Sequence, residues 1–130
     1  MAEREVSIVK VRDVLLVTLP SSPGDRTIGN LQDRVLGKMQ ETDPAGVVID
    51  VSLVETVDSF FARTMEETAQ MIALMGGRTV IAGIPPAVAV TATELGLDFG
   101  QAESALDVER ALDLLTGASE VKKSSDEGED

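Results

Sequence analysis

The chain has 130 residues, of which 43% are hydrophobic and 26% charged, a balance typical of one globular domain. It contains no histidine and no cysteine, which excludes imidazole or thiolate catalysis, disulfides and metal sites built from those ligands. Eleven basic and 23 acidic residues give a formal net charge of −12, so nucleic acid and anionic membranes are poor partners. Because no apolar stretch is long enough to span a membrane and the start does not resemble a signal peptide, we expect a cytoplasmic protein.

Apolar periodicity predicts nine elements in the order β-β-α-β-α-β-α-β-α. The expected bounds, in chain order, are residues 6–11, 14–19, 27–41, 47–51, 59–75, 78–82, 86–95, 99–102 and 107–116. The first two runs are separated only by Arg12 and Asp13, which suits a tight antiparallel hairpin. The order predicts an α/β fold, with a mixed, mostly parallel sheet and amphipathic helices packed against it.

The second helix is expected to begin at Asp58 or Ser59 and to end at Gly76 and Gly77. Helical spacing predicts an inner face of Phe61, Thr64, Met65, Thr68, Met71, Ile72 and Met75. The same spacing predicts an outer face of Arg63, Glu66, Glu67 and Gln70. Methionines at this spacing are more typical of a core than of a binding groove.

The last helix is expected to be capped by Asp107 and ended by Gly117. The 14 residues from 117 onward are rich in serine and acid, which predicts a disordered tail. The sequence therefore predicts one domain over residues 1–116 and an acidic tail over residues 117–130.

Glycine-rich phosphate loops are absent, so nucleotide enzymes are disfavoured. Asp50, at the end of a predicted central strand, stands where a receiver domain carries its phospho-accepting aspartate. Such a site needs Mg²⁺ held by further carboxylates and a cation for the phosphoryl oxygens. The neighbouring strand ends supply neither, so local pairing of Asp50 is the favoured interpretation.

Ser59 is the strongest candidate for chemistry, because it stands at the predicted start of a helix that follows a buried strand. Unpaired backbone amides and the positive end of the helix dipole lie at such a position, so an added phosphate is tolerated there. Asp58 and Ser59 are also common N-cap residues, and spacing alone favours a simple cap. Thr91 and Thr93 are the next candidate acceptors.

Two stretches resemble a known family. Residues 46–60 (GVVIDVSLVETVDSF) resemble the central strand and switch-serine helix of STAS domains. Residues 74–91 (LMGGRTVIAGIPPAVAVT), followed by Glu94-Leu95-Gly96, resemble the RsbS-type branch of small stressosome antagonists. The likeness is colinear from about residue 6 to residue 115. At residues 91–93 the chain departs from the branch, with Ala92 where a bulkier apolar residue is usual.

The resemblance implies a single non-enzymatic STAS domain that needs no cofactor or metal. It implies a dimer and a large co-assembly with RsbR-like STAS paralogues, which sequesters an RsbT-like switch kinase. Phosphorylation of Ser59 would release this kinase and activate a stress response, and an RsbX-like phosphatase would reset the switch. Asp58, Ser59, Arg63 and Glu66 are the expected partner-binding residues.

Three alternatives stay open at this stage. One is a free anti-anti-sigma factor of the same fold, which binds an anti-sigma kinase without a large assembly. Another is a receiver that accepts phosphate on Asp50. The third is a structural subunit without a switch.

Overall fold

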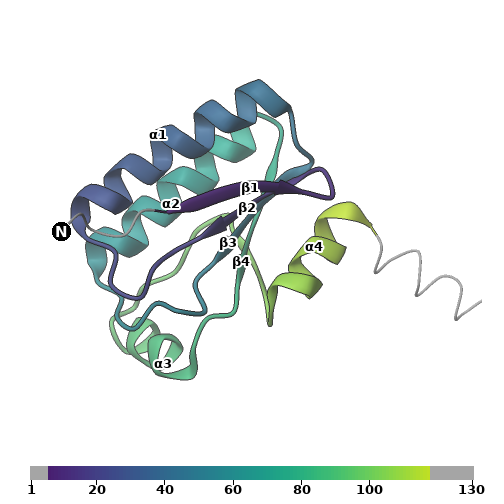
Figure 1. The fold of residues 1–130 in the computed structure, drawn as a ribbon. Coiled ribbons are helices and arrows are strands. Elements are labelled where there is room, and N and C mark those ends of the chain that lie inside the picture. The colour runs from purple at the N-terminus through teal and green to yellow at the C-terminus, as the bar shows by residue number, and fades with distance from the viewer. Residues whose placement is uncertain (1–5, 118–130) are drawn as a thin grey trace, which may run out of the picture.

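The computed structural model describes residues 6–117. They form a five-stranded sheet and four helices in the predicted order (Figure 1). The elements are β1 (Ser7–Val11), β2 (Val14–Thr18), α1 (Asp25–Thr42), β3 (Gly46–Asp50), α2 (Ser59–Leu74), β4 (Arg78–Ala82), α3 (Pro86–Glu94), β5 (Glu103–Ala105) and α4 (Val108–Thr116).

The strands lie in the order β1-β2-β3-β4-β5, with β1 antiparallel to β2 and the other pairs parallel. This confirms the predicted mixed, mostly parallel sheet. Arg12 and Asp13 form the turn of the β1–β2 hairpin, with φ of +50° and +63°. Positive φ at both central residues is the geometry that matches the twist of the flanking strands.

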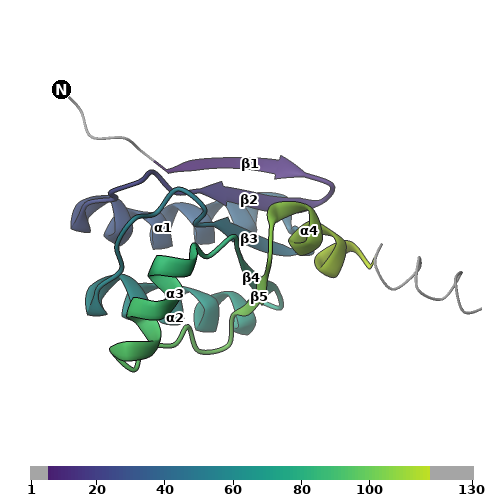
Figure 2. The ribbon, with the colours of Figure 1, turned by 90° about the horizontal axis from the view of Figure 1, so that it is seen from below.

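Each face of the sheet has its own apolar layer, because successive strand residues point to opposite sides. Leu15 and Ile49 belong to the layer that packs with α1 and α2, whereas Val14 and Val48 belong to the layer that packs with α4. Figures 1 and 2 show α1 and α2 on one side of the sheet and α4 on the other, with α3 near the ends at which the parallel strands finish. Burial on both faces explains the continuous apolar runs of β3 and β4.

A buried polar contact joins α1 to α2. The Gln32 side-chain amide donates to the Thr68 hydroxyl (3.2 Å), which in turn donates to the Thr64 carbonyl (2.7 Å). Thr68 is fully buried, and these two hydrogen bonds satisfy its hydroxyl, which would be costly to leave without a partner in the core.

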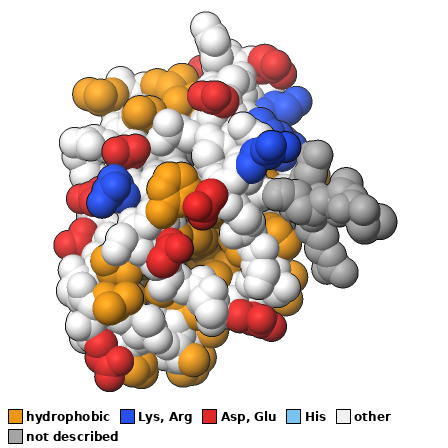
Figure 3. Space-filling view, turned by 90° about the vertical axis from the view of Figure 1, so that its left-hand side faces the viewer, with side chains coloured by type: hydrophobic (Ala, Val, Ile, Leu, Met, Phe, Trp, Pro, Cys, Tyr) orange, Lys and Arg blue, Asp and Glu red, His pale blue; other side chains and the backbone are white. Residues whose placement is uncertain are grey.

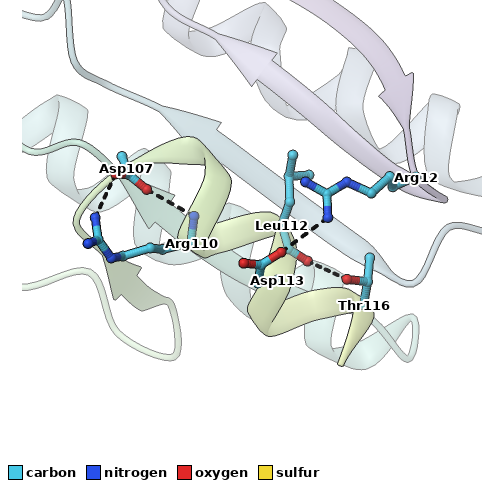
Figure 4. A network of polar contacts seen from close by, with 6 residues as sticks. All are labelled: Arg12, Asp107, Arg110, Leu112, Asp113 and Thr116. Carbon is cyan, nitrogen blue, oxygen red and sulfur yellow. Dashed lines mark hydrogen bonds and ion pairs between the residues drawn. The ribbon is translucent and has the colours of Figure 1, made fainter. Parts of the chain in front are cut away.

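Helix α4 is capped locally and is tied to the β1–β2 turn by one ion pair (Figure 4). The Asp107 carboxylate accepts from the Arg110 amide (2.9 Å), which confirms the predicted cap. Asp113 pairs with Arg12 of the β1–β2 turn (3.1 Å), so the helix is tied to the far end of the hairpin. Gly117 ends α4 with φ of +77°, as predicted, and the tail beyond it lies outside the described residues.

The predicted edge strand at residues 99–102 is wrong in position, since β5 is Glu103–Ala105. Where the strand was predicted, the chain instead makes a turn: the Asp98 carboxylate accepts from the Gly100 amide (2.9 Å), and Gly100 has φ of +65°. The polar segment after this turn pairs with β4 at the sheet edge. An edge strand needs only one partner, so a short polar segment suffices.

The predicted inner face of α2 is wrong at Met71 and Met75, which are 38% and 47% exposed. Ile72 and Met65 are fully buried, as predicted. Met71 and Met75 therefore lie on the side of the last turns of α2 that faces away from the core, although Ile72 between them faces inward. Within residues 6–117, no helix combines the length and the apolar character needed to cross a membrane.

Candidate functional site

The β3–α2 connection carries Ser59 and leaves the carboxyl end of a central parallel strand, where α/β sheets commonly hold their sites. Its conformation is set by two backbone hydrogen bonds, from the Val51 amide to the Ala82 carbonyl and from the Glu55 amide to the Ser21 carbonyl (both 3.0 Å). Three buried valines anchor it to the core: Val51, Val54 and Val57. The connection therefore presents the first turn of α2 in a defined position.

Asp58 is the N-cap of α2. Its carboxylate accepts from the Phe61 amide (2.8 Å), and its backbone carbonyl accepts from the Ala62 amide (3.0 Å). The capping role suggested for the Asp58–Ser59 pair thus belongs to Asp58 alone.

Ser59 is the first residue of the helix and is exposed. Within residues 6–117, its hydroxyl has no hydrogen-bond partner, and the backbone amides of Ser59 and Phe60 have no acceptor. These amides belong to the unpaired donors that every helix start leaves over, and they lie at the positive end of the helix dipole. The Ser59 oxygen is therefore accessible and lies beside backbone amides that favour negative charge.

A groove of about 260 Å³ adjoins Ser59. Residues of α2 line it on one side, and the connection from α3 to β5 lines it on the other. The lining residues are Ser59, Ala62, Arg63, Glu66, Gly96, Leu97 and Asp98. This groove is the candidate docking site for a partner that reads Ser59.

Glu66 lies where α2 meets the α3–β5 connection. A Cβ atom at Gly100 would lie 2.6 Å from Glu66 Cγ, so a side chain at position 100 would force Glu66 to move. Glycine at this position, with φ of +65°, lets the connection approach α2 closely.

Charge in the groove is mixed. Glu66 and Asp98 contribute carboxylates, and Arg63 is the one basic side chain among the lining residues. Figure 3 shows the end of the molecule at which α1 and α2 begin, where acidic side chains lie among exposed hydrophobic ones and basic side chains are fewer. The groove beside Ser59 therefore carries one cation and two anions.

Of the four predicted partner-binding residues, the structure brings Ser59, Arg63 and Glu66 to one groove. Asp58 instead lines a small separate hollow with Asp25 of α1. Thr91 and Thr93 are exposed on α3 and are not among the lining residues of the groove.

Asp50 accepts a hydrogen bond from the Ser52 amide (3.0 Å), which confirms the predicted local pairing. It lines a second hollow, of about 480 Å³, together with Asp107. Among residues 6–117, no three acidic, histidine or cysteine side chains are grouped so as to hold a metal ion.

Sequence reasoning missed the far wall of the groove, Gly96 to Asp98. Gly96 directly follows the helix predicted at residues 86–95 and has φ of +71°. No local pattern indicates that the following residues lie against α2, because that contact depends on where β5 joins the sheet.

Comparison with known proteins identifies the family of this chain. The STAS domain model matches residues 5–111, most of the chain. The chain belongs to the STAS domain family. It is 33% identical to a serine-to-glutamate variant of RsbS from Moorella thermoacetica, with a TM-score of 0.76 over 90% of this chain and 99% of that one. A chain in a structure of the stressosome, described there as a signal integration and transduction hub, is 34% identical, with a TM-score of 0.74 over 87% of this chain and 98% of that one.

A sequence relative is the RsbT co-antagonist protein RsbRA of Bacillus subtilis, 29% identical over 67% of this chain and 30% of that protein. This chain thus corresponds to less than a third of RsbRA. As a STAS protein it has the anti-sigma factor antagonist fold, and both RsbS and a stressosome chain match almost its whole described length.

Proposed function

We propose that this STAS protein is the RsbS-like subunit of a stressosome-type assembly, which binds an RsbT-like serine kinase and releases it once Ser59 is phosphorylated. The accessible, unbonded hydroxyl of Ser59 beside the groove is the observation that carries the proposal. Similarity to RsbS over 90% of the chain supports the same role. The protein itself is a substrate and a scaffold and catalyses no reaction.

The modification is a phosphoryl transfer from ATP. A bond forms between Ser59 Oγ and the γ-phosphorus as the bond from that phosphorus to the bridging oxygen of ADP breaks. ADP leaves, and the hydroxyl proton passes to a base on the kinase. The substrate must supply only a reachable hydroxyl on a rigid support, which Asp58 and the β3–α2 connection provide.

Release follows from charge. The phosphate adds about −1.5 to −2 charge at neutral pH, beside the carboxylates of Glu66 and Asp98. A kinase that covers this groove must then desolvate and face the added charge. A tenfold loss of affinity needs only about 1.4 kcal/mol, so modest repulsion is enough.

The partners in this scheme are RsbR-like STAS proteins, the kinase and an RsbX-like phosphatase that removes the phosphate. The likeness to a stressosome chain and to the co-antagonist RsbRA supports a dimer and a large co-assembly.

The first test is the intact mass of wild type and of Ser59→Ala after incubation with ATP, Mg²⁺ and an RsbT-like kinase. We expect one added phosphate on wild type and none on the variant. Phosphate on both proteins would move the acceptor to another residue, with Thr91 and Thr93 next. Phosphate on neither would contradict the switch.

Gel filtration with an RsbR-like partner separates the stressosome scheme from a free anti-sigma factor antagonist. We expect both proteins to elute together as a very large particle. Ser59→Ala should retain the kinase in this particle in the presence of ATP, and Ser59→Asp should weaken kinase binding. Equal kinase binding by the two variants would contradict release by charge.

A further inference from the structure

We propose that Arg63 is a positioning residue that folds back onto the phosphate of phosphorylated Ser59 and holds it on α2. The proposal rests on phosphorylation of Ser59 and adds how the switch acts. The phosphate would then have two effects on the groove. It adds negative charge, and it pairs with the Arg63 guanidinium that a partner would otherwise contact.

Helix geometry brings the two side chains together. Ser59 and Arg63 are four residues apart on α2 and line the same groove. Residues at this spacing are neighbours on a helix surface, with Cβ atoms about 5–6 Å apart. The pair also has the favourable orientation, because the acidic group precedes the basic one along the helix.

Arg63 is available for this contact. It makes no hydrogen bond or ion pair within residues 6–117, whereas Arg12 and Arg110 pair with aspartates. A guanidinium can donate two parallel hydrogen bonds to one phosphate, which a lysine cannot do.

The surrounding charges direct the phosphate toward Arg63. Glu66 and Asp98 repel it from the far part of the groove, and Asp58 lies on the other side of the helix start. The unpaired amides of Ser59 and Phe60 attract it to the first turn of α2. Arg63 is the cation that completes this arrangement, since no other basic side chain lines the groove.

The test measures the second pKa of the phosphate by ³¹P NMR titration, on protein in which phosphoserine is incorporated at position 59 during synthesis. An adjacent cation stabilises the dianion and lowers this pKa. We expect the pKa to be about 0.5 unit higher in Arg63→Gln than in wild type, and to be intermediate in Arg63→Lys. The matched control is Lys38→Gln, which removes the same charge from α1 at a site away from the groove.

An unchanged pKa in Arg63→Gln would overturn the proposal, and so would an equal shift in Lys38→Gln, which would indicate a general field. The unmodified Arg63→Gln protein should melt with wild type, because Arg63 is exposed and makes no bond within the described residues. Because the phosphate is installed without a kinase, failure of this test is distinguishable from failure of the kinase to act on Ser59.

Discussion

The two ends of α2 are built differently. At its start, Asp58 caps the helix and the next residue, Ser59, is a small exposed serine beside a polar groove. At its other end, the exposed side chains are large and apolar: Met71, Leu74 and Met75 are 38%, 86% and 47% exposed. One helix thus has a capped start, where Phe60 is 39% exposed beside Ser59, and a far end at which three large apolar side chains are exposed.

This difference between the two ends bears on the modification that we propose at Ser59. The start of α2 has a backbone held by the cap and by the loop before it, so an exposed hydroxyl there occupies a defined position. At the far end, Ile72 is fully buried, whereas Met71, Leu74 and Met75 lie on the uncovered side of the helix. The two ends therefore differ in how the fold holds and covers them, and amino-acid composition alone does not explain the difference.

The largest expected effect tests the exposed end. Ile72→Ala should lower the free energy of unfolding by about 2–4 kcal/mol, because it leaves a cavity in the core beneath α2. Met71→Ala, one residue away but on the exposed side, should cost less than about 1 kcal/mol. Urea denaturation of both variants measures the two losses in the free energy of unfolding. Equal losses would return Met71 to the inner face that the sequence predicts.

The next effect tests the capped end. Asp58→Ala should cost about 1 kcal/mol of stability, because the Phe61 amide loses its acceptor, whereas Asp58→Asn should retain most of it. Asp107→Ala, which removes the corresponding cap of α4, is the matched control. Ser59→Ala should change stability by less than about 0.5 kcal/mol. A loss at Ser59 as large as that at Asp58 would make Ser59 the cap.

The smallest effect concerns Glu103, which pairs with Arg78 at the start of β4, just after α2 ends. Hydrogen bonds from Arg78, and then its charge, hold the pKa of Glu103 below its ordinary value, although slight burial opposes this. A lowered folded-state pKa stabilises the fold above the unfolded-state pKa, and this stabilisation is lost as the pH falls through the folded-state pKa. Because both side chains are about half exposed, we expect less than about 1 kcal/mol.

Comparison of wild type and Glu103→Gln by thermal unfolding at pH 7 and pH 3 checks this. The variant should be slightly less stable at neutral pH, and the difference should vanish in acid. A difference that persists at pH 3 would mean that the pair contributes through packing rather than charge.

Much of the fold was predictable because its signals are local. The hairpin depends on two residues between two β-rich runs, and the cap depends on Asp58 standing directly before an amphipathic helix. The buried strands β3 and β4 were predictable because burial on both faces demands uninterrupted apolar residues. Resemblance to STAS domains added the role that we propose for Ser59, which local pattern alone would have left as part of a helix cap.

The groove was not predictable, since it forms where α2 meets residues far along the chain, Gly96 to Asp98. Pairing of β5 with β4 carries Asp98 and Gly100 up to Glu66, and no local pattern encodes that meeting. The exposure of Met71 was not predictable for a similar reason, because periodicity indicates which residues share a helix face but not how much of that face the rest of the fold covers. The sequence by itself therefore determined the order of the elements, the position of the serine and the bounds of most elements, but not the position of β5. Only the tertiary structure decided which charges surround that serine, because long-range packing alone brings them together.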